Sequence, residues 1–218
     1  MKIVIQCAGS KNPTPDAGFR SPDNRLVKFV AHPKEAPVGG EFAYARPDDL
    51  SDDRQTWRER LLDYNDGAST NPKGLLRAYE LYKNPIYKNL VTKFGSEQVF
   101  ILSAGWGLIS SDFLIPDYDI TFSGTAERER YKRRKETDSY NDFFQLPDDG
   151  EPTIFLGGQN YLPLFCHLTA GMKGMKKVFF NSKAESVPGF RFERFETEQR
   201  SNWHYKCAQY LIDGKVEA

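Results

Sequence analysis

The sequence predicts an α/β fold with helices on both sides of a small, mostly parallel sheet of about four strands. Short apolar runs of strand length recur along the chain, at residues 2–7, 98–103, 152–156 and 178–181. Segments with helical spacing of apolar residues separate these runs, and such alternation favours a parallel sheet. We therefore expect a three-layer sandwich formed by residues 1–218 as a single domain.

Composition narrows the class of protein. The chain has 218 residues, with 39% hydrophobic and 14% aromatic residues, which excludes wholesale disorder. No apolar run approaches the roughly 18–20 residues of a membrane span, and the first residues turn polar too soon for a signal peptide. The odd count of three cysteines, without regular spacing, fits free thiols in a reducing cytoplasm. We expect a cytoplasmic protein without a membrane partner.

The N-terminal quarter combines one strand with an irregular segment. Residues 2–7 (KIVIQC) form an apolar run that ends before Gly9. Residues 12–50 contain six of the 13 prolines and show no clear periodicity. A structureless stretch of this length is unusual inside a compact domain, so we expect a long loop insertion that acts as a lid or mobile loop.

Helical patterns dominate the middle of the chain. Residues 51–64 and 73–83 have helical spacing, and a short helix follows Pro85 and ends at Gly95. The second strand, 98–103, runs into a long loop. A long charged helix is expected from Thr125 to about Phe144.

The C-terminal third completes the alternation. After the strand at 152–156 we expect a short helix at 160–170 and the strand at 178–181. Residues 190–195 alternate and predict an edge strand. Thr197 is expected to cap a last helix that reaches about Asp213.

Ligands of open α/β sheets bind beyond the carboxyl ends of the strands. All four predicted ends are small and polar, which favours a ligand site over plain turns, although strand ends need turn residues in any case. The candidate substrate-binding residues at these ends are Cys7, Ser10, Lys11, Asn12, Ser103, Gly105, Trp106, Gly107, Gly158, Gln159, Tyr161 and Asn181, with Ser182 and Lys183 following the last strand.

The loop after the first strand favours phosphate binding without matching a nucleotide triphosphatase. Cys7 to Lys11 lacks the spacing of a P-loop, but Ser10 and Lys11 could hold one phosphate in a backbone nest. Cys7 at the end of a buried strand is more typical of a packed small residue than of a nucleophile. The histidines and cysteines show no ligand spacing, so neither a structural zinc site nor any other cofactor is expected.

The segment Asp117-Tyr118-Asp119 supplies carboxylates to a loop above the sheet. Such carboxylates can stabilise a cationic transition state or orient a water, and a solvated turn is the alternative. We take Asp117, Asp119 and Gln6 as candidate catalytic residues and Tyr118 as a binding residue.

Residues 127–136 contain six basic and three acidic residues. In a helix Arg128, Lys132 and Lys135 would share one face, with Arg133 beside it. A solvated helix with internal ion pairs is the plain interpretation, and a phosphate-contacting face is the functional one.

Four motifs in order resemble a bacterial and phage family. They are Cys7-Ala8-Gly9-Ser10-Lys11, the segment from Tyr79 to Tyr87, the segment from Phe100 to Ile109, and the segment from Ile115 to Thr121. The family pattern has a Cys-Ser/Ala-x-Lys turn, a Leu-Tyr-x-Ser/Asn-Pro helix, a Leu-Ser-Ala-x-x-Gly-Leu strand end and a Pro-Tyr-Asp segment. This chain departs from it in the 12–50 insertion and in Pro116-Asp117-Tyr118.

That family is similar to the uracil-DNA-glycosylase-like fold and to the cores of archaeosine-synthase-like proteins. The resemblance implies action on nucleobases, and anti-phage glycosylases that remove glucosylated hydroxymethylcytosine are similar too. The departure at Pro116-Asp117-Tyr118 leaves open whether Asp117 or Asp119 is the functional carboxylate.

We therefore expect a DNA glycosylase that extrudes a modified base from double-stranded DNA into the pocket at the strand ends. Trp106 and Tyr161 would stack on the base. A nucleobase-modifying transferase, in which Cys7 and Lys11 matter more, and a non-catalytic nucleotide-binding module remain alternatives. The net charge of zero, from 30 basic and 30 acidic residues, favours local contact with DNA over bulk attraction.

Overall fold

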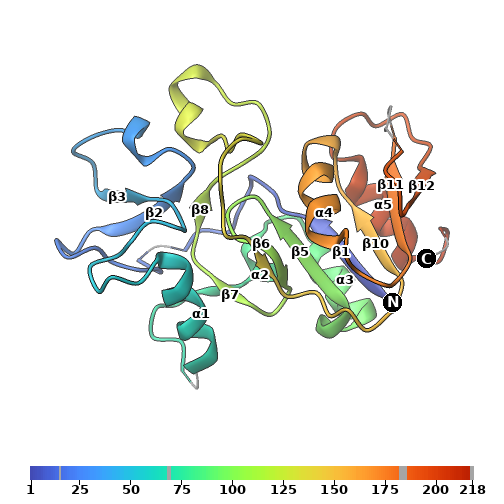
Figure 1. Cartoon of the computed structure of the whole chain (residues 1–218), viewed down its shortest axis with the longest axis horizontal. Coiled ribbons are helices and arrows are strands. Elements are labelled where there is room, and N and C mark those ends of the chain that lie inside the picture. Colours follow the sequence, from blue (N-terminus) through green and yellow to red (C-terminus); the bar gives the residue numbers. More distant parts are fainter. Residues whose placement is uncertain (15, 68–69, 182–185, 217–218) are drawn as a thin grey trace.

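The structure is a computed structural model that describes residues 1–14, 16–67, 70–181 and 186–216. Its centre is a mixed sheet of seven strands in the order β12-β11-β10-β1-β5-β6-β9 (Figure 1). The α/β class is confirmed, but the sheet is larger than the four strands expected. The strands are β1 (Lys2–Gln6), β5 (Val99–Ser103), β6 (Gly107–Ser110), β9 (Phe143–Phe144), β10 (Thr153–Leu156), β11 (Lys176–Phe180) and β12 (Phe190–Arg194).

The sheet is mixed because the chain reverses directly after β5. Five strands from β12 to β5 run parallel, whereas β6 pairs antiparallel with β5. Gly107 makes the reversal possible, since its φ is +88° and a Cβ there would lie 2.6 Å from the backbone nitrogen of Phe143. Residues 104–122, expected as a loop, therefore contain β6, β7 (Leu114–Ile115) and β8 (Tyr118–Asp119).

Helices cover both faces of the large sheet (Figure 1). Helix α3 (Ile86–Phe94) and helix α5 (Trp203–Ile212) contact one another. Helix α4 (Leu162–Thr169) connects β10 to β11, while α3 connects β1 to β5 on the other side of the sheet order. Because parallel crossovers are right-handed, two crossovers that run in opposite directions place α3 and α4 on opposite faces. The reversal of strand order lies between β1 and β10.

A second, three-stranded sheet replaces the long loop predicted for residues 12–50. Strand β2 (Leu26–Val30) pairs in parallel with β3 (Phe42–Ala45) on one side and with β8 on the other. The apolar side chains of β2 pack into the main core, with Val27 and Phe29 buried. The expectation of a loop is therefore wrong for Leu26–Val30 and Phe42–Ala45, because β2 pairs both with β3 and with β8, a partner far along the chain.

The first two predicted helices are shorter than expected. Residues 51–55 form a turn in which the Ser51 hydroxyl donates to the carbonyl of Gln55 at 2.7 Å. Helix α1 (Trp57–Gly67) then begins with a capping box, because Glu59 accepts the N–H of Thr56 and donates its own N–H to the Thr56 hydroxyl. Residues 73–83 divide into β4 (Leu76–Arg77), which pairs with β7, and helix α2 (Ala78–Leu81).

The long charged helix predicted for 125–144 is wrong. Only the 3₁₀ helix η3 (Glu127–Lys132) forms there, and the chain then runs irregularly to β9. The segment has no apolar stripe that could bury one face of a long helix. Instead the side chain of Arg134 is buried against Asp142, with bonds of 2.8 and 2.6 Å, and this pairing folds the segment back on itself.

The later elements follow the sequence closely. Strand β12 lies at the sheet edge, as expected for 190–195, and α4 follows a 3₁₀ turn η4 (Gln159–Tyr161). The last helix begins at Trp203 rather than at Thr197, after Asn202 adopts a left-handed φ of 56°. Among the described residues no helix combines the length and apolar character that a membrane span needs.

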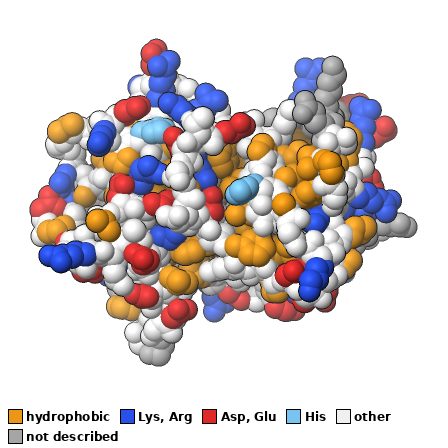
Figure 2. Space-filling model, in the orientation of Figure 1, with side chains coloured by type: hydrophobic (Ala, Val, Ile, Leu, Met, Phe, Trp, Pro, Cys, Tyr) orange, Lys and Arg blue, Asp and Glu red, His pale blue; other side chains and the backbone are white. Residues whose placement is uncertain are grey.

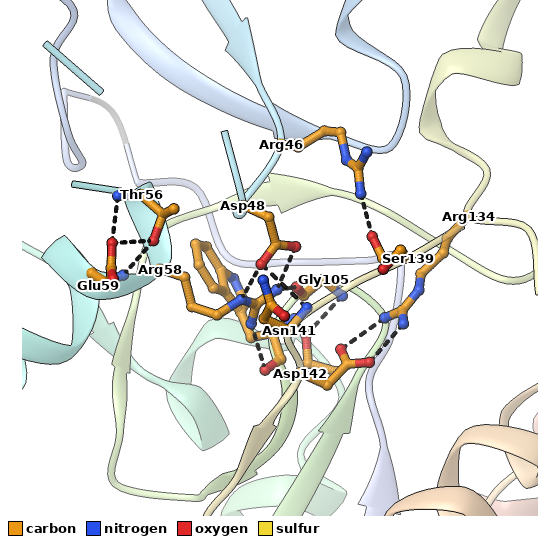
Figure 3. Close-up of polar contacts among 12 residues, drawn as sticks. Arg46, Asp48, Thr56, Arg58, Glu59, Gly105, Arg134, Ser139, Asn141 and Asp142 are labelled. Atoms are coloured by element: carbon orange, nitrogen blue, oxygen red, sulfur yellow. Dashed lines mark hydrogen bonds and ion pairs between the residues drawn. The ribbon is translucent and has the colours of Figure 1, made fainter. Parts of the chain in front are cut away.

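Two buried arginines fix the turn between β5 and β6 (Figure 3). Arg58 pairs with Asp48 and donates to the carbonyls of Gly105 and Trp106, both at 3.0 Å. Arg134 pairs with Asp142 and donates to the carbonyl of Ala104 at 2.9 Å. The carbonyls of all three turn residues therefore accept hydrogen bonds from protein side chains. This arrangement joins the small sheet, α1 and the large sheet into one continuous core.

Candidate functional site

A polar cavity of about 500 Å³ opens at the carboxyl ends of β1 and β10. It lies where the strand order reverses, which is the position at which open α/β sheets bind ligands. We call it the strand-end cavity. Its lining residues come from the β1 loop, the end of α2, the segment after β8, the β10 loop and the start of α5, and they are Gln6, Cys7, Ala8, Gly9, Ser10, Lys83, Asn84, Thr121, Ser123, Tyr161, Asn202 and Tyr205.

Gln6 links the two strand ends that frame this cavity. Its Oε1 accepts the backbone N–H of Gly158 at 2.5 Å, so the side chain spans from β1 to the β10 loop. The backbone carbonyl of Gln6 accepts the Tyr87 hydroxyl at 2.8 Å, and that hydroxyl lies 3.4 Å from the hydroxyl of Tyr205. The position of Gln6 is therefore fixed from the sheet and from α3.

Cys7 and Tyr161 form the floor of the strand-end cavity. The Cys7 Sγ lies 3.2 Å from the Tyr161 hydroxyl and accepts the N–H of Ala104 at 3.5 Å. The two residues are only 3% and 5% exposed. Burial raises the pKa of Tyr161 well above its ordinary value, so its hydroxyl keeps its proton.

Lys83, Asn84, Asn202 and Tyr205 are cavity residues that sequence reasoning missed. Lys83 and Asn84 belong to the Tyr79–Tyr87 motif, which was the available signal. The N–H of Lys83 donates to the carbonyl of Ser10 at 3.2 Å and brings the end of α2 beside the β1 loop. Asn202 and Tyr205 come from the start of α5, and no local pattern marks them.

Ser103 and Tyr118, predicted as binding residues, are buried behind the cavity. The Ser103 hydroxyl donates to that of Tyr118 at 2.9 Å and accepts the N–H groups of Gly105 and Trp106. The hydroxyls of Tyr118 and Tyr82 lie 2.8 Å apart. These hydroxyl groups already have hydrogen-bond partners within the protein, and none of them lines the strand-end cavity.

The prediction that Trp106 stacks on a ligand does not fit the structure. Its ring is fully buried, between Phe29 at 5.0 Å and Phe143 at 6.4 Å. Gly105 and Gly107 serve the same turn, whose carbonyls are held by Arg58. The glycines here permit close packing of the chain against itself rather than approach of a ligand.

Gly158, Gln159 and Asn181 lie around a neighbouring slot between β10 and β11. Its other walls are apolar and include Phe179 and Trp203. The Asn181 side chain donates to the carbonyl of Gln199 at 3.0 Å, which anchors it away from the strand-end cavity. Ser182 and Lys183, expected to follow Asn181, lie outside the described residues.

Asp117 and Asp119 lie in a cluster of lysines rather than in the strand-end cavity. Lys28 forms an ion pair with Asp117 and lies 3.9 Å from Asp119. Lys132 lies 3.5 Å from Asp119, and Lys11 lies 3.6 Å from Asp117. Asp117 faces a separate cavity beside the small sheet. We call these five residues the lysine–aspartate cluster.

Lys11 faces that cluster and not the β1 loop. Its ammonium donates to the carbonyl of Tyr118 and lies 4.4 Å from the centre of the Tyr118 ring. Burial lowers the pKa of Lys11, while Asp117 opposes that shift. The neighbouring Asn12 donates to the carbonyl of Glu80 at 2.7 Å. Neither side chain reaches the strand-end cavity, although both were predicted as ligand contacts.

The four basic residues predicted to bind DNA do not share a helix face. Arg128, Arg133 and Lys135 are exposed, whereas Lys132 is half-buried and bonded to Glu129 at 2.9 Å. Lys135 lies beside a third cavity, between the segment after η3 and α4. Figure 2 shows basic and acidic side chains interspersed over this face of the molecule rather than one basic patch.

Within the described ranges, no group of three or more His, Cys, Asp or Glu side chains is arranged to hold a metal ion. A scan against models of protein families and a comparison with curated proteins find no match to this chain. The candidate function therefore depends on the chemistry of the strand-end cavity and on the resemblance stated above.

Proposed function

We propose that this protein is a DNA glycosylase with a uracil-DNA-glycosylase-like fold, and that the strand-end cavity receives a modified base extruded from the duplex. The observation that carries the proposal is the position of this cavity at the reversal of strand order, where Gln6 lines it and links β1 to the β10 loop. A volume of about 500 Å³ lies within the range of small-ligand sites. The half-buried ring of Tyr205 offers aromatic surface for the base, and the hydroxyl of Tyr161 lies at the floor.

The donors of the cavity suit the leaving group of the reaction. When the N-glycosidic bond breaks, both electrons go to the base, water adds to the sugar carbon, and the proton of that water reaches the base. Because the Oε1 of Gln6 is occupied by Gly158, its amide NH₂ is left to stabilise the negative charge that develops on the base. Gln6 thus keeps its predicted catalytic role.

This proposal gives the carboxylates of Asp117 and Asp119 a structural role instead of a catalytic one. Asp117 and Asp119 are neutralised by Lys11, Lys28 and Lys132 and lie outside the lining of the cavity. We assign them to the support of β8 and the small sheet. The positive charge on the sugar would then be stabilised by the DNA phosphates next to it rather than by a protein carboxylate.

The test is direct. The protein is incubated with DNA that carries glucosylated hydroxymethylcytosine and with unmodified DNA of the same sequence. We expect abasic sites and free modified base from the first substrate and neither product from the second. Free base from neither DNA would overturn the proposal.

One observation favours a second candidate, a nucleobase-modifying transferase of the archaeosine-synthase type. The Cys7 thiol is at the floor of the strand-end cavity, 3.2 Å from a hydroxyl that stays protonated. A nucleophilic thiol there would be positioned to attack a bound base. A covalent adduct on Cys7, detected by mass spectrometry of the intact protein after incubation with DNA, would support the transferase.

A further inference from the structure

The strand-end cavity has an unbalanced charge. Lys83 is the one charged side chain among its twelve lining residues, and no Asp or Glu is among them. In the part of the chain that the structure describes, no carboxylate lies within 4 Å of the Lys83 ammonium. Lys11 and Lys28, by contrast, both have Asp117 as a neighbour. An exposed cation without a partner is therefore present at the cavity.

Two side-chain amides of the cavity are oriented as donors. The Oε1 of Gln6 accepts the N–H of Gly158, and the Oδ1 of Asn84 accepts the N–H of Ile86 at 3.0 Å. A backbone N–H can only donate, so these contacts fix which end of each amide is the oxygen. Neither NH₂ group has a hydrogen-bond acceptor among the described residues, so both are free to donate to a ligand.

The β1 loop adds backbone donors. The N–H groups of Ala8, Gly9 and Ser10 make no hydrogen bond within the described chain, and all three residues line the cavity. A Cβ on Gly9 would meet nothing within 4 Å, so the space beside this loop is open. These N–H groups are available to donate to an anion that enters this space.

From these donors we propose that the strand-end cavity holds the phosphate group of a nucleotide, with Lys83 as its cation. This inference rests on the proposed function in one respect, since the nucleotide is the one whose base enters the cavity. The sequence suggested Lys11 for this role, but Lys11 is occupied by Tyr118 and Asp117. A charge-assisted contact from Lys83 and neutral donors from Asn84 and the loop match the oxygens of a phosphate.

The base and the phosphate of the nucleotide would lie at different depths in the strand-end cavity. Cys7 and Tyr161 at the floor are almost fully buried and neutral, whereas Lys83 is exposed. A base extruded from DNA enters a pocket first, while its phosphate stays at the mouth with the rest of the backbone. The cation is thus at the mouth and the neutral hydrogen-bonding groups are at the floor, in the order that an extruded nucleotide requires.

The experiment compares 2′-deoxycytidine 5′-monophosphate with 2′-deoxycytidine by titration calorimetry at millimolar concentrations. We expect the nucleotide to bind wild-type protein about tenfold or more tightly than the nucleoside, because a charge-assisted contact to phosphate has this magnitude. The substitution Lys83→Gln removes that preference. The matched control Lys88→Gln removes an exposed lysine of the neighbouring helix α3 and retains the preference.

Two competitors identify the source of the phosphate. Displacement of the nucleotide by inorganic phosphate points to a free phosphate group, and displacement by an unmodified single-stranded oligonucleotide points to the DNA backbone. Either result supports the inference. Equal binding of nucleotide and nucleoside, no binding of the nucleotide, or a preference that survives Lys83→Gln overturns it.

The two proposals fail separately. Loss of the phosphate preference in Lys83→Gln, together with no base release from any DNA, would retain the phosphate site and reject the glycosylase. Base release from modified DNA, with equal affinity for nucleotide and nucleoside, would reject the phosphate site and retain the glycosylase.

Discussion

The side chain of Gln6 accepts the N–H of Gly158 at 2.5 Å and so joins the ends of β1 and β10. These two adjacent strands precede crossovers that leave the sheet in opposite directions. The contact therefore does two things. It links the end of β1 to the β10 loop, and it turns the amide NH₂ away from Gly158 as a free donor.

Substitution of Gln6 separates those two effects. Gln6→Glu keeps an oxygen for Gly158 but replaces the free NH₂ with a second oxygen. We expect the rate of base release to fall by about 100-fold, the usual effect of losing one donor to a developing negative charge. Single-turnover kinetics on modified DNA measure this. Gln159→Glu, the same change beside the neighbouring slot, should retain the rate, and equal losses in both variants would contradict the role of Gln6.

Cys7 distinguishes the hydrolase from the transferase. In the glycosylase Cys7 has only a structural role, in contact with Tyr161 and Ala104, so we expect Cys7→Ala to lower base release less than about tenfold. In a transferase with a thiol nucleophile the same substitution abolishes product, while Asp117→Asn and Asp119→Asn spare it. Quantitative product analysis by mass spectrometry decides, with Cys166→Ala outside the cavity as the control.

The buried pair of Arg134 and Asp142 predicts a large effect on stability. Arg134→Met leaves the Asp142 carboxylate buried without a partner, and we expect the free energy of unfolding to fall by about 3–5 kcal/mol. Urea denaturation followed by fluorescence measures the change. Arg128→Met, at an exposed position, should shift it by less than about 0.5 kcal/mol. A similar small shift for Arg134→Met would refute the importance of the pair.

The backbone conformation at Gly107 predicts that a side chain at this position destabilises the fold. Gly107→Ala combines a φ of +88° with a Cβ that would lie 2.6 Å from the backbone of Phe143. We expect a loss of about 2 kcal/mol or more in the free energy of unfolding, because neither the turn nor β9 can move freely. Gly40→Ala, with open space around its Cβ, is the control for thermal denaturation. Equal stability of the two variants would show that the turn adapts.

His204 predicts a loss of stability in mild acid. It is 2% exposed, its Nε2 has no partner among the described residues, and burial lowers its pKa to about 4. Between its ordinary value near 6.5 and pH 4, the unfolded chain binds a proton that the folded protein does not. The free energy of unfolding therefore falls with falling pH over this window, by about 3 kcal/mol in total.

The variant His204→Phe isolates this contribution from that of the carboxylates. Urea denaturation of both proteins at several pH values gives the difference in their free energies of unfolding. We expect that difference to change across the window between pH 6.5 and 4 and to be flat above it. A constant difference over the whole range would mean that His204 binds its proton equally well in both states.

Local patterns in the sequence were sufficient for the strands and helices with strong signals. The apolar run at 2–7 forms β1, the run at 98–103 forms β5, and Gly95 ends α3 with a φ of 87°. These elements depend on short-range chemistry: buried β-branched residues, and a glycine that adopts a left-handed conformation. The sheet of residues 26–45 was missed because its register depends on β8, a partner distant in the chain.

The sequence predicted those cavity residues that lie at the ends of strands, and it missed most of those that other elements contribute. Gln6, Cys7 and Tyr161 lie at or just beyond the carboxyl ends of parallel strands, which meet at one edge of the sheet, and the structure brings them together. Asn202 and Tyr205 reach the same cavity through the packing of α5, which no local pattern encodes. Asp117 was misplaced because strand alternation turns Tyr118 inward and its two neighbours toward the lysines.

The pairing of β2 with β8 and of β1 with β10 bears on the order of events during synthesis. Phe29 acquires its partner Tyr118, and Ile3 its partner Ile154, only after more than half of the 218 residues have been synthesised. Contacts of such sequence separation slow folding and leave early segments unpaired. N-terminal fragments that end before Thr153 thus present the apolar strand β1 with an open edge, and such an edge favours aggregation until β10 pairs with it.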